Sequence, residues 1–350
     1  MDKILTIIIP TYNMEKYLRH CLDSLIVPNM DKVEVLVIND GSKDSSSAIG
    51  HEYQDKYPQT FRVIDKENGN YGSCVNRGLK ESSGKYVKIL DADDWFESDN
   101  FPSYIKILSQ ADVDMIISDY DIVNEHGIEF KNIKFNKVFK TPYEKFQLGD
   151  LFKEHNSRTI FQMHSIAFKK SCLDLINYRQ TEGISYTDQE WIFKPLVAIS
   201  NCLYIDFVIY KYVIGREGQT MESSGRVKNI IDLEKVVLSM ASYYDRTKCI
   251  YEIKEYMKTI LINQLHCIYR EFLFSDFNNN KVFLEFDVEL SNFSSVYKLL
   301  QDIYIIKGRG HYVKYWINHK RRKLPLYWKS FYNISKIIIN TKNRLLNDKL

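Results

Sequence analysis

The sequence predicts an α/β protein with a mainly parallel, doubly wound sheet and a helical C-terminal region. Over the first 120 residues, short apolar runs typical of strands alternate with helical patterns. Such alternation is typical of a parallel sheet whose strands are joined by crossover helices. The length of 350 residues suggests about two domains. An apolar share of 45% supports a substantial core and excludes a disordered protein.

The first strand is expected over residues 4–9, a continuous apolar run suited to burial on both faces of a sheet. Asn13 follows and is expected to cap a helix whose apolar side chains recur at helical spacing up to Leu25. The remaining predicted elements of this part are strands over 33–38, 61–64, 86–90 and 114–118 and a helix over 72–79.

The pattern changes in the second half of the chain. Short helices are expected to begin at Ser171 and Asp188, and residues 203–213 alternate aliphatic and tyrosine side chains as a strand would. From Ile230 to Ile268, apolar residues recur at helical spacing. We therefore expect a catalytic domain over residues 1–220 and a mostly helical region over residues 221–350.

Asp91-Ala92-Asp93, followed by Asp94, is the most informative motif of the chain. It comes directly after a predicted strand, at the edge where α/β sheets bind ligands. Three carboxylates within four residues repel one another, and such oxygen ligands suit Mg²⁺ or Mn²⁺. The motif predicts a divalent metal that neutralises a diphosphate, although so short a pattern also fits a solvated acidic turn.

Other strand ends are expected to meet the same crevice, because the carboxyl ends of parallel strands share one edge. Thr11 and Tyr12 follow the first strand, Asp40 the second, and residues 66–72 the third. Tyr12 can stack on a base, Asp40 can accept from an imide N–H, and the Gly72 helix can direct N–H groups at phosphate. Each feature alone has a structural explanation, such as a common turn at Asp40.

These motifs resemble family 2 glycosyltransferases, which have the nucleotide-sugar-binding fold called GT-A. The resemblance covers about residues 1–220 and is highly specific over 1–100. It rests on residues 7–13 (IIIPTYN), 37–45 (VINDGSKDS), 68–72 (NGNYG) with 76–78 (NRG), and 90–95 (LDADDW).

The resemblance implies an inverting transfer of a sugar from a nucleotide diphosphate, usually UDP, to a hydroxyl. Tyr12 would stack on uracil and Asp40 would bind its N3–H. Asp91 would contact ribose or metal, and Asp93 would ligate the Mn²⁺ or Mg²⁺ that bridges the diphosphate. The expected donor-binding set is Pro10, Thr11, Tyr12, Asp40, Lys66, Asn70, Gly72, Asp91, Ala92 and Arg216.

Inversion needs a catalytic base, which the family places in a Glu-Asp pair opening a helix after the sheet. Asp188 takes the aspartate position, Thr187 stands in place of the glutamate, and Glu190 is the alternative base. A purely structural role for Asp188, as a helix cap, is the competing interpretation. Residues 215–220 resemble the family's mobile lid, from which Arg216 would reach a phosphate.

His164 is the one histidine that could line the acceptor cleft, but a lone histidine near apolar residues is more often structural. The sequence alone leaves both interpretations open.

The net charge of +3 conceals a strong asymmetry, since residues 307–350 carry +11 and residues 1–306 carry −8. Residues 320–323 are all basic and precede Tyr327 and Trp328, a combination that suits an anionic membrane surface. A nucleic-acid patch and a solvated helical face are the alternatives. We expect a cytoplasmic protein held peripherally at the inner face of the membrane, with no nucleic acid partner, and leave a homo-oligomer open.

Other classes are disfavoured. The six cysteines form no CxxC pair, which fits a reducing compartment, and neither a leader nor an apolar run of the ~18 residues that span a bilayer is expected. A sugar-nucleotide nucleotidyltransferase needs a Gly-rich basic loop after the first strand, and a dinucleotide oxidoreductase needs a GxGxxG motif there. Residues 10–13 (PTYN) provide neither. A non-catalytic nucleotide- or glycan-binding module would not need Asp91, Asp93 and Asp188. The expected function is a hexosyltransferase acting on a glycan or lipid-linked acceptor in surface polysaccharide synthesis.

Overall fold

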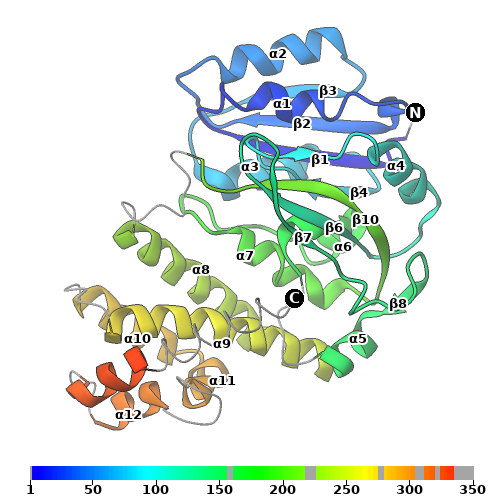
Figure 1. Cartoon of the computed structure of the whole chain (residues 1–350). Coiled ribbons are helices and arrows are strands. Elements are labelled where there is room, and N and C mark those ends of the chain that lie inside the picture. Colours follow the sequence, from blue (N-terminus) through cyan, green and yellow to red (C-terminus); the bar gives the residue numbers. More distant parts are fainter. Residues whose placement is uncertain are drawn as a thin grey trace. The chain divides into compact units, whose positions relative to one another are not determined.

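A ten-stranded sheet forms the centre of the first of two units into which the chain divides (Figure 1). The computed structural model describes residues 2–155, 161–216, 226–274, 280–303, 311–319 and 324–334. Unit 1 comprises residues 1–232 and 248–253, and unit 2 comprises residues 233–247 and 254–350. Unit 1 therefore contains every residue predicted for the donor site.

Most of the ladder in this sheet is parallel. The strand order is β3 (Phe61–Asp65), β2 (Val33–Asn39), β1 (Leu5–Thr11), β4 (Tyr86–Ile89), β9 (Ile166–Lys169), β6 (Met115–Val123), β10 (Asn201–Val213) and β5 (Trp95–Phe96), with β7 (Glu129–Ile133) on β6 and β8 (Lys145–Gln147) on β10. The pairings among β3, β2, β1 and β4 are parallel, as is that of β6 with β10. β9 is antiparallel to both β4 and β6 and joins the two parallel groups. The predicted α/β class is confirmed.

Burial explains why the apolar runs became central strands. Leu5, Ile7, Ile8 and Ile9 of β1 have no exposed surface. β1 pairs with β2 on one side and β4 on the other, so both of its edges are satisfied within the sheet.

Helices cover the sheet of unit 1. They are α1 (Leu18–Asp23), α2 (Ser46–Lys56), α3 (Asn70–Glu81), α4 (Phe101–Gln110), α5 (Leu148–His155), α6 (Lys170–Leu175) and α7 (Asp188–Trp191). α3 lies close to β1, because a Cβ added at Gly78 would lie 2.5 Å from the Ile8 side chain. Only glycine permits this approach.

The predicted helix cap at Asn13 is wrong. The helix begins at Leu18, and Asn13 has a left-handed backbone with a φ of 53°. Its side-chain oxygen accepts from the Lys43 N–H at 2.8 Å, and its own N–H donates to Ser42 Oγ at 3.0 Å. Asn13 therefore joins the loops after β1 and β2, since asparagine tolerates this backbone conformation better than most residues.

Unit 2 is helical and has an aromatic core. Its elements include the end of α8 (Arg226–Arg246), most of α9 (Tyr251–Phe274), α10 (Asn280–Ser291), α11 (Ser294–Tyr297), α12 (Tyr312–Asn318) and a helix over 326–334. The ring centres of Tyr269 and Phe283 lie 5.1 Å apart, and that of Trp316 lies 5.3 Å from Phe283. The buried Asp287 carboxylate accepts from the Tyr269 hydroxyl, so its charge does not stand unsolvated in this core.

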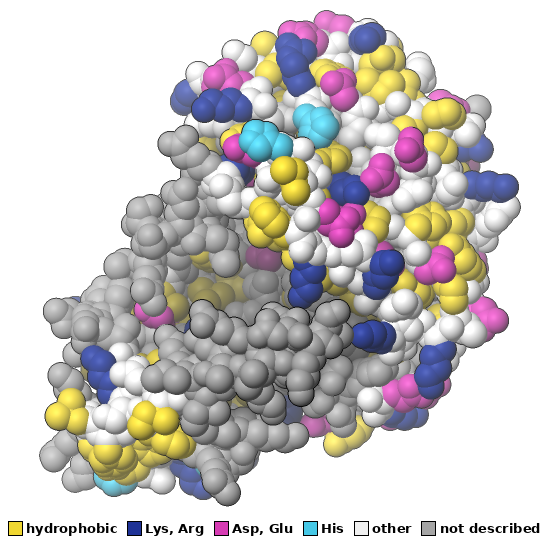
Figure 2. Space-filling model, viewed as in Figure 1, with side chains coloured by type: hydrophobic (Ala, Val, Ile, Leu, Met, Phe, Trp, Pro, Cys, Tyr) yellow, Lys and Arg dark blue, Asp and Glu magenta, His cyan; other side chains and the backbone are white. Residues whose placement is uncertain are grey.

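Two surface properties bear on the expected partners. Among the described helices, none combines the length and the apolar content needed to cross a membrane. On the face shown in Figure 2, basic and acidic side chains of the described residues are interspersed rather than gathered by sign. The basic run over 320–323 lies outside the described residues.

Candidate active site

The carboxyl ends of β1 and β2 lie side by side and form one wall of the site. Thr11 pairs with Asn39 in the ladder, and the Asp40 N–H donates to the Thr11 carbonyl at 2.8 Å. Asp40 is 3% exposed, and its Oδ1 accepts from Lys66 Nζ at 2.5 Å and from the Gly69 N–H at 2.9 Å. The three predicted residues Thr11, Asp40 and Lys66 are thus brought together from three strand ends.

The other residues of the predicted donor set frame this wall. Tyr12 is 47% exposed, so its ring is available to a ligand. Asn70 has a φ of 65° and opens α3, and Pro10 and Ala92 are partly and fully buried respectively. Gly72 lies against another segment of chain, because a Cβ there would lie 2.1 Å from the Thr181 carbonyl oxygen.

The three carboxylates after β4 have different environments. Asp94 is buried and accepts from the Tyr210 hydroxyl at 2.6 Å and from the Val213 N–H at 2.7 Å. These bonds tie the turn after β4 to β10. Burial, followed by the charges of Asp93 and Asp91, raises the pKa of Asp94 well above its usual value.

Asp91 faces the site and is held by one tyrosine. The Tyr71 hydroxyl donates to Asp91 Oδ1 at 2.7 Å. Burial and the negative charge of Asp93 raise the pKa of Asp91 to about 7, and the charge of Asp188 acts in the same direction. Asp91 therefore lies close enough to both Asp93 and Asp188 for their charges to act on it.

Arg216 contacts the carboxylates directly. Its guanidinium pairs with the Asp93 carboxylate and lies 5.2 Å from the centre of the Tyr17 ring. The sequence placed Arg216 in the donor site, and the structure places it against Asp93. The rest of the predicted lid, residues 217–220, lies outside the described residues.

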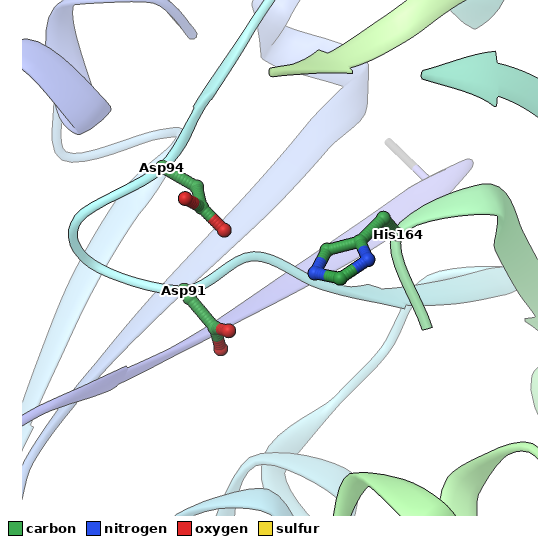
Figure 3. Close-up of side chains that lie close together, drawn as sticks. All are labelled: Asp91, Asp94 and His164. Carbon is green, nitrogen blue, oxygen red and sulfur yellow. The ribbon is translucent and has the colours of Figure 1, made fainter. Parts of the chain in front are cut away.

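A group able to hold a metal ion consists of Asp91, Asp94 and His164 (Figure 3). One ligand atom of each residue lies within 4.8 Å of the others. Among the described residues, no ion pair to Asp91 or Asp94 competes with a cation, and carboxyl oxygens are the ligands that hard divalent cations prefer. The residues present therefore fit the expected Mn²⁺ or Mg²⁺.

His164 reaches this group from the short helix η2 (Met163–Ser165), which leads into β9. Its ring stacks on Tyr212 with 4.0 Å between centres and meets Tyr210 edge-on at 4.9 Å. The buried Lys88 of β4 donates to the His164 carbonyl at 2.7 Å. Burial and the nearby charge of Lys88 lower the pKa of His164 to about 3, so the imidazole is neutral at physiological pH.

The two candidate bases in α7 differ sharply. Glu190 is fully buried and accepts from Thr181 N–H at 2.6 Å, from Thr181 Oγ1 at 2.8 Å and from Lys194 Nζ at 2.7 Å. Asp188 is half-buried, accepts from Gln189 Nε2 at 2.9 Å, and has a pKa raised by burial. Thr187, not Asp188, occupies the cap position of α7, and its side chain makes no capping hydrogen bond.

Comparison with known proteins identifies the chain. The model of the family "Glycosyl transferase family 2" matches residues 6–174. An uncharacterized glycosyltransferase of Rickettsia prowazekii is 36% identical over 232 residues, which cover 66% of this chain and 70% of the relative. The chain belongs to glycosyltransferase family 2.

Two further comparisons place this glycosyltransferase in context. It is 31% identical to glycosyltransferase GlyA of Streptococcus pneumoniae over 166 residues, which cover 47% of the chain but 24% of that relative. The crystal structure of Staphylococcus aureus TarS residues 1–349 in complex with UDP-GlcNAc superposes with a TM-score of 0.67 at 18% identity, over 94% of this chain and 91% of that chain. The predicted family and the GT-A fold are thereby confirmed.

Sequence reasoning about this glycosyltransferase did not assign three residues around the carboxylates and considered His164 only for the acceptor cleft. The three are Tyr71, which donates to Asp91, Tyr210, which donates to Asp94, and Lys88, which donates to the His164 carbonyl. A lysine inside the apolar strand at 86–90 was the only available signal, because a buried lysine needs specific acceptors. The two tyrosines come from distant segments, and nothing in their local sequence marks them.

Proposed function

We propose that this glycosyltransferase is an inverting, UDP-sugar-dependent hexosyltransferase acting on a hydroxyl of a glycan or lipid-linked glycan in surface polysaccharide synthesis. The observation that carries the proposal is Asp188, a half-buried carboxylate whose charge raises the pKa of Asp91 at the end of β4. One group of carboxylates to bind a donor, with a separate one to activate an acceptor, is the arrangement an inverting transfer requires.

The donor site proposed for UDP is the wall formed by Thr11, Asp40 and Lys66 with Tyr12 above it. Asp40 offers a carboxylate to an imide N–H, and Lys66 holds that carboxylate in place at 2.5 Å. The exposed Tyr12 ring offers a stacking surface for one pyrimidine. The UDP-GlcNAc bound to TarS, a protein of the same fold, supports a UDP donor.

The proposed reaction is a single displacement. The acceptor hydroxyl oxygen forms a bond to C1 of the donor sugar, its proton passes to the Asp188 carboxylate, and the C1–O bond breaks with its electron pair leaving on the diphosphate. General base catalysis of this kind contributes roughly 10²–10⁴-fold in rate. The buried Glu190, already engaged by Lys194 and Thr181, is the less suitable base.

Asp91 and Asp93 are proposed to hold the divalent cation. When bound, Mn²⁺ or Mg²⁺ supplies charge that stabilises the departing diphosphate. Arg216, now on Asp93, is positioned to meet an anionic group that approaches the same carboxylate.

The deciding experiment is a screen of UDP-sugars with Mn²⁺, in which donor hydrolysis and protection against thermal unfolding are both measured. We expect at least one UDP-sugar to be hydrolysed and UDP to protect more strongly than GDP. Chelator or Asp93→Asn should abolish turnover without unfolding the protein. Full activity in chelator, or tighter binding of GDP in calorimetry, would contradict the proposal.

We also propose that residues 1–220 form the catalytic domain and that the basic tail after residue 306 holds the enzyme peripherally at the cytoplasmic face of the membrane. Each basic residue near an anionic surface contributes about 1 kcal/mol. Anionic vesicles should bind the full chain at low salt and release it as salt rises, because screening extends over about 8 Å at physiological ionic strength. Truncation before Lys307 should abolish vesicle binding and leave donor hydrolysis intact, and a full chain that ignores such vesicles would refute membrane association.

A further inference from the structure

We propose that His164 is a nitrogen ligand of the divalent cation proposed for Asp91 and Asp93, that Asp94 is a further oxygen ligand of the same site, and that His164 makes the enzyme prefer Mn²⁺ over Mg²⁺. The inference deepens the proposed function, since it rests on a cation being bound at the donor site. It adds a residue that lies outside the Asp-x-Asp motif and 70 or more positions from it in the sequence.

The geometry is close to that of a metal site. Two ligands bound at about 2.0–2.2 Å to one ion lie at most about 4.4 Å apart. The ligand atoms of Asp91, Asp94 and His164 lie within 4.8 Å of one another, so small side-chain rotations suffice. In Figure 3 the carboxylates of Asp91 and Asp94 and one ring nitrogen of His164 are turned toward the same space.

The ring of His164 is held in place without using its nitrogens. Tyr212 stacks on one face, and Tyr210 and Tyr120 contact the ring at 4.9 and 5.3 Å between centres. Lys88 fixes the backbone through the His164 carbonyl. Among the described residues, the buried Nδ1 has no hydrogen-bond partner, which is unusual for a buried polar atom.

The charges around the site also favour a cation. The ammonium of the buried Lys88 donates to the carbonyls of His164 and Ile166. Arg216 pairs with Asp93. Within the described part of the chain, no ion pair joins Asp91 or Asp94 to a cationic side chain. The imidazole beside these two carboxyl groups is a donor set with two oxygens and one nitrogen.

This donor set predicts metal preference. Mg²⁺ demands oxygen ligands in near-ideal octahedral geometry and keeps several of its waters. Imidazole suits later divalent metals, and Mn²⁺ accepts both oxygen and nitrogen ligands. Removing His164 should therefore weaken Mn²⁺ binding and leave Mg²⁺ binding nearly unchanged. If carboxylates alone formed the site, removing His164 would change the binding of neither metal.

The test is pulsed electron paramagnetic resonance of Mn²⁺ bound to the full chain, with and without UDP. We expect a ¹⁴N modulation from a coordinated imidazole, replaced by the ¹⁵N pattern when the protein is labelled with ¹⁵N-histidine. His164→Gln should remove the modulation and weaken Mn²⁺ binding at least about 10-fold, with Mg²⁺ binding within about 3-fold. His51→Gln, on an exposed histidine bound to Asp65, is the matched control and should change neither.

Mn²⁺ that binds without histidine modulation, or that fails to bind at all, overturns the inference. The unmodified protein decides the ligand by itself, so a His164→Gln chain that does not fold leaves the result intact. The proposed function is judged separately by donor hydrolysis. Turnover with Mn²⁺ but no histidine modulation would reject His164 as a ligand and leave the proposed function standing. Modulation without turnover would support His164 as a ligand and count against the proposed UDP-sugar transfer.

Discussion

Asp188 and Glu190 stand two positions apart in α7, and substitution of each should damage a different property of the enzyme. Glu190→Gln removes a carboxylate that has no exposed surface and that pairs with Lys194, a side chain only 12% exposed, at 2.7 Å. The amide cannot accept from all three donors that now surround the carboxylate, and the ammonium loses its counter-charge. Breaking a buried pair in this way costs about 3–5 kcal/mol of unfolding free energy.

Asp188→Asn should behave in the opposite way. The asparagine oxygen can still accept from Gln189, and burial disfavours the charged form of Asp188, so the substitution should not lower the unfolding free energy. The amide cannot take up the acceptor proton at neutral pH. Transfer should therefore fall by at least about 10²-fold while UDP affinity stays nearly unchanged.

Two measurements separate the loss of stability from the loss of transfer: urea unfolding and the initial rate of UDP release. Both are made below the unfolding temperature of the less stable variant. The double variant Glu190→Gln with Lys194→Met removes both charges and should recover part of the lost stability, which controls for the buried-charge explanation. A stable but inactive Glu190→Gln enzyme, together with an active Asp188→Asn enzyme, would refute the reasoning and make Glu190 the base.

Three further outcomes are expected. The pKa of Asp91 is raised to about 7, so the stability it contributes is present at low pH and lost as pH rises through 7. Thermal unfolding in chelator should therefore show that Asp91→Asn stabilises the protein by about 1–3 kcal/mol at pH 8 and by far less at pH 5. Gly72→Ala would place a Cβ 2.1 Å from the Thr181 carbonyl oxygen, so both stability and turnover should fall, and an unchanged melting temperature would contradict this contact. Lys66→Met removes the ammonium that holds Asp40, and calorimetry should show UDP binding weakened by at least about 10-fold; equal affinity would exclude the pair from the donor site.

The sequence alone was sufficient for the parallel half of the sheet and for the position of the carboxylates. Continuous apolar runs such as that at 4–9 can be buried on both faces only inside a sheet, and β1 lies there with its side chains fully buried. The loops after β1, β2 and β4 then meet at one edge, because parallel strands point the same way. Thr11, Asp40 and Asp91 could therefore be assigned to one crevice from local patterns.

Tertiary structure decided the rest, because the remaining contacts join segments whose local sequences carry no sign of one another. β9 enters the sheet antiparallel between β4 and β6, and with it η2 brings His164 to carboxylates 70 or more positions earlier in the sequence. Asp94 is fastened by Tyr210, which lies 116 residues away, and Glu190 is made structural by Lys194 and Thr181. A carboxylate has the same local pattern whether it is buried and paired or open to a ligand. Only the surrounding charges, donors and burial decide which it is.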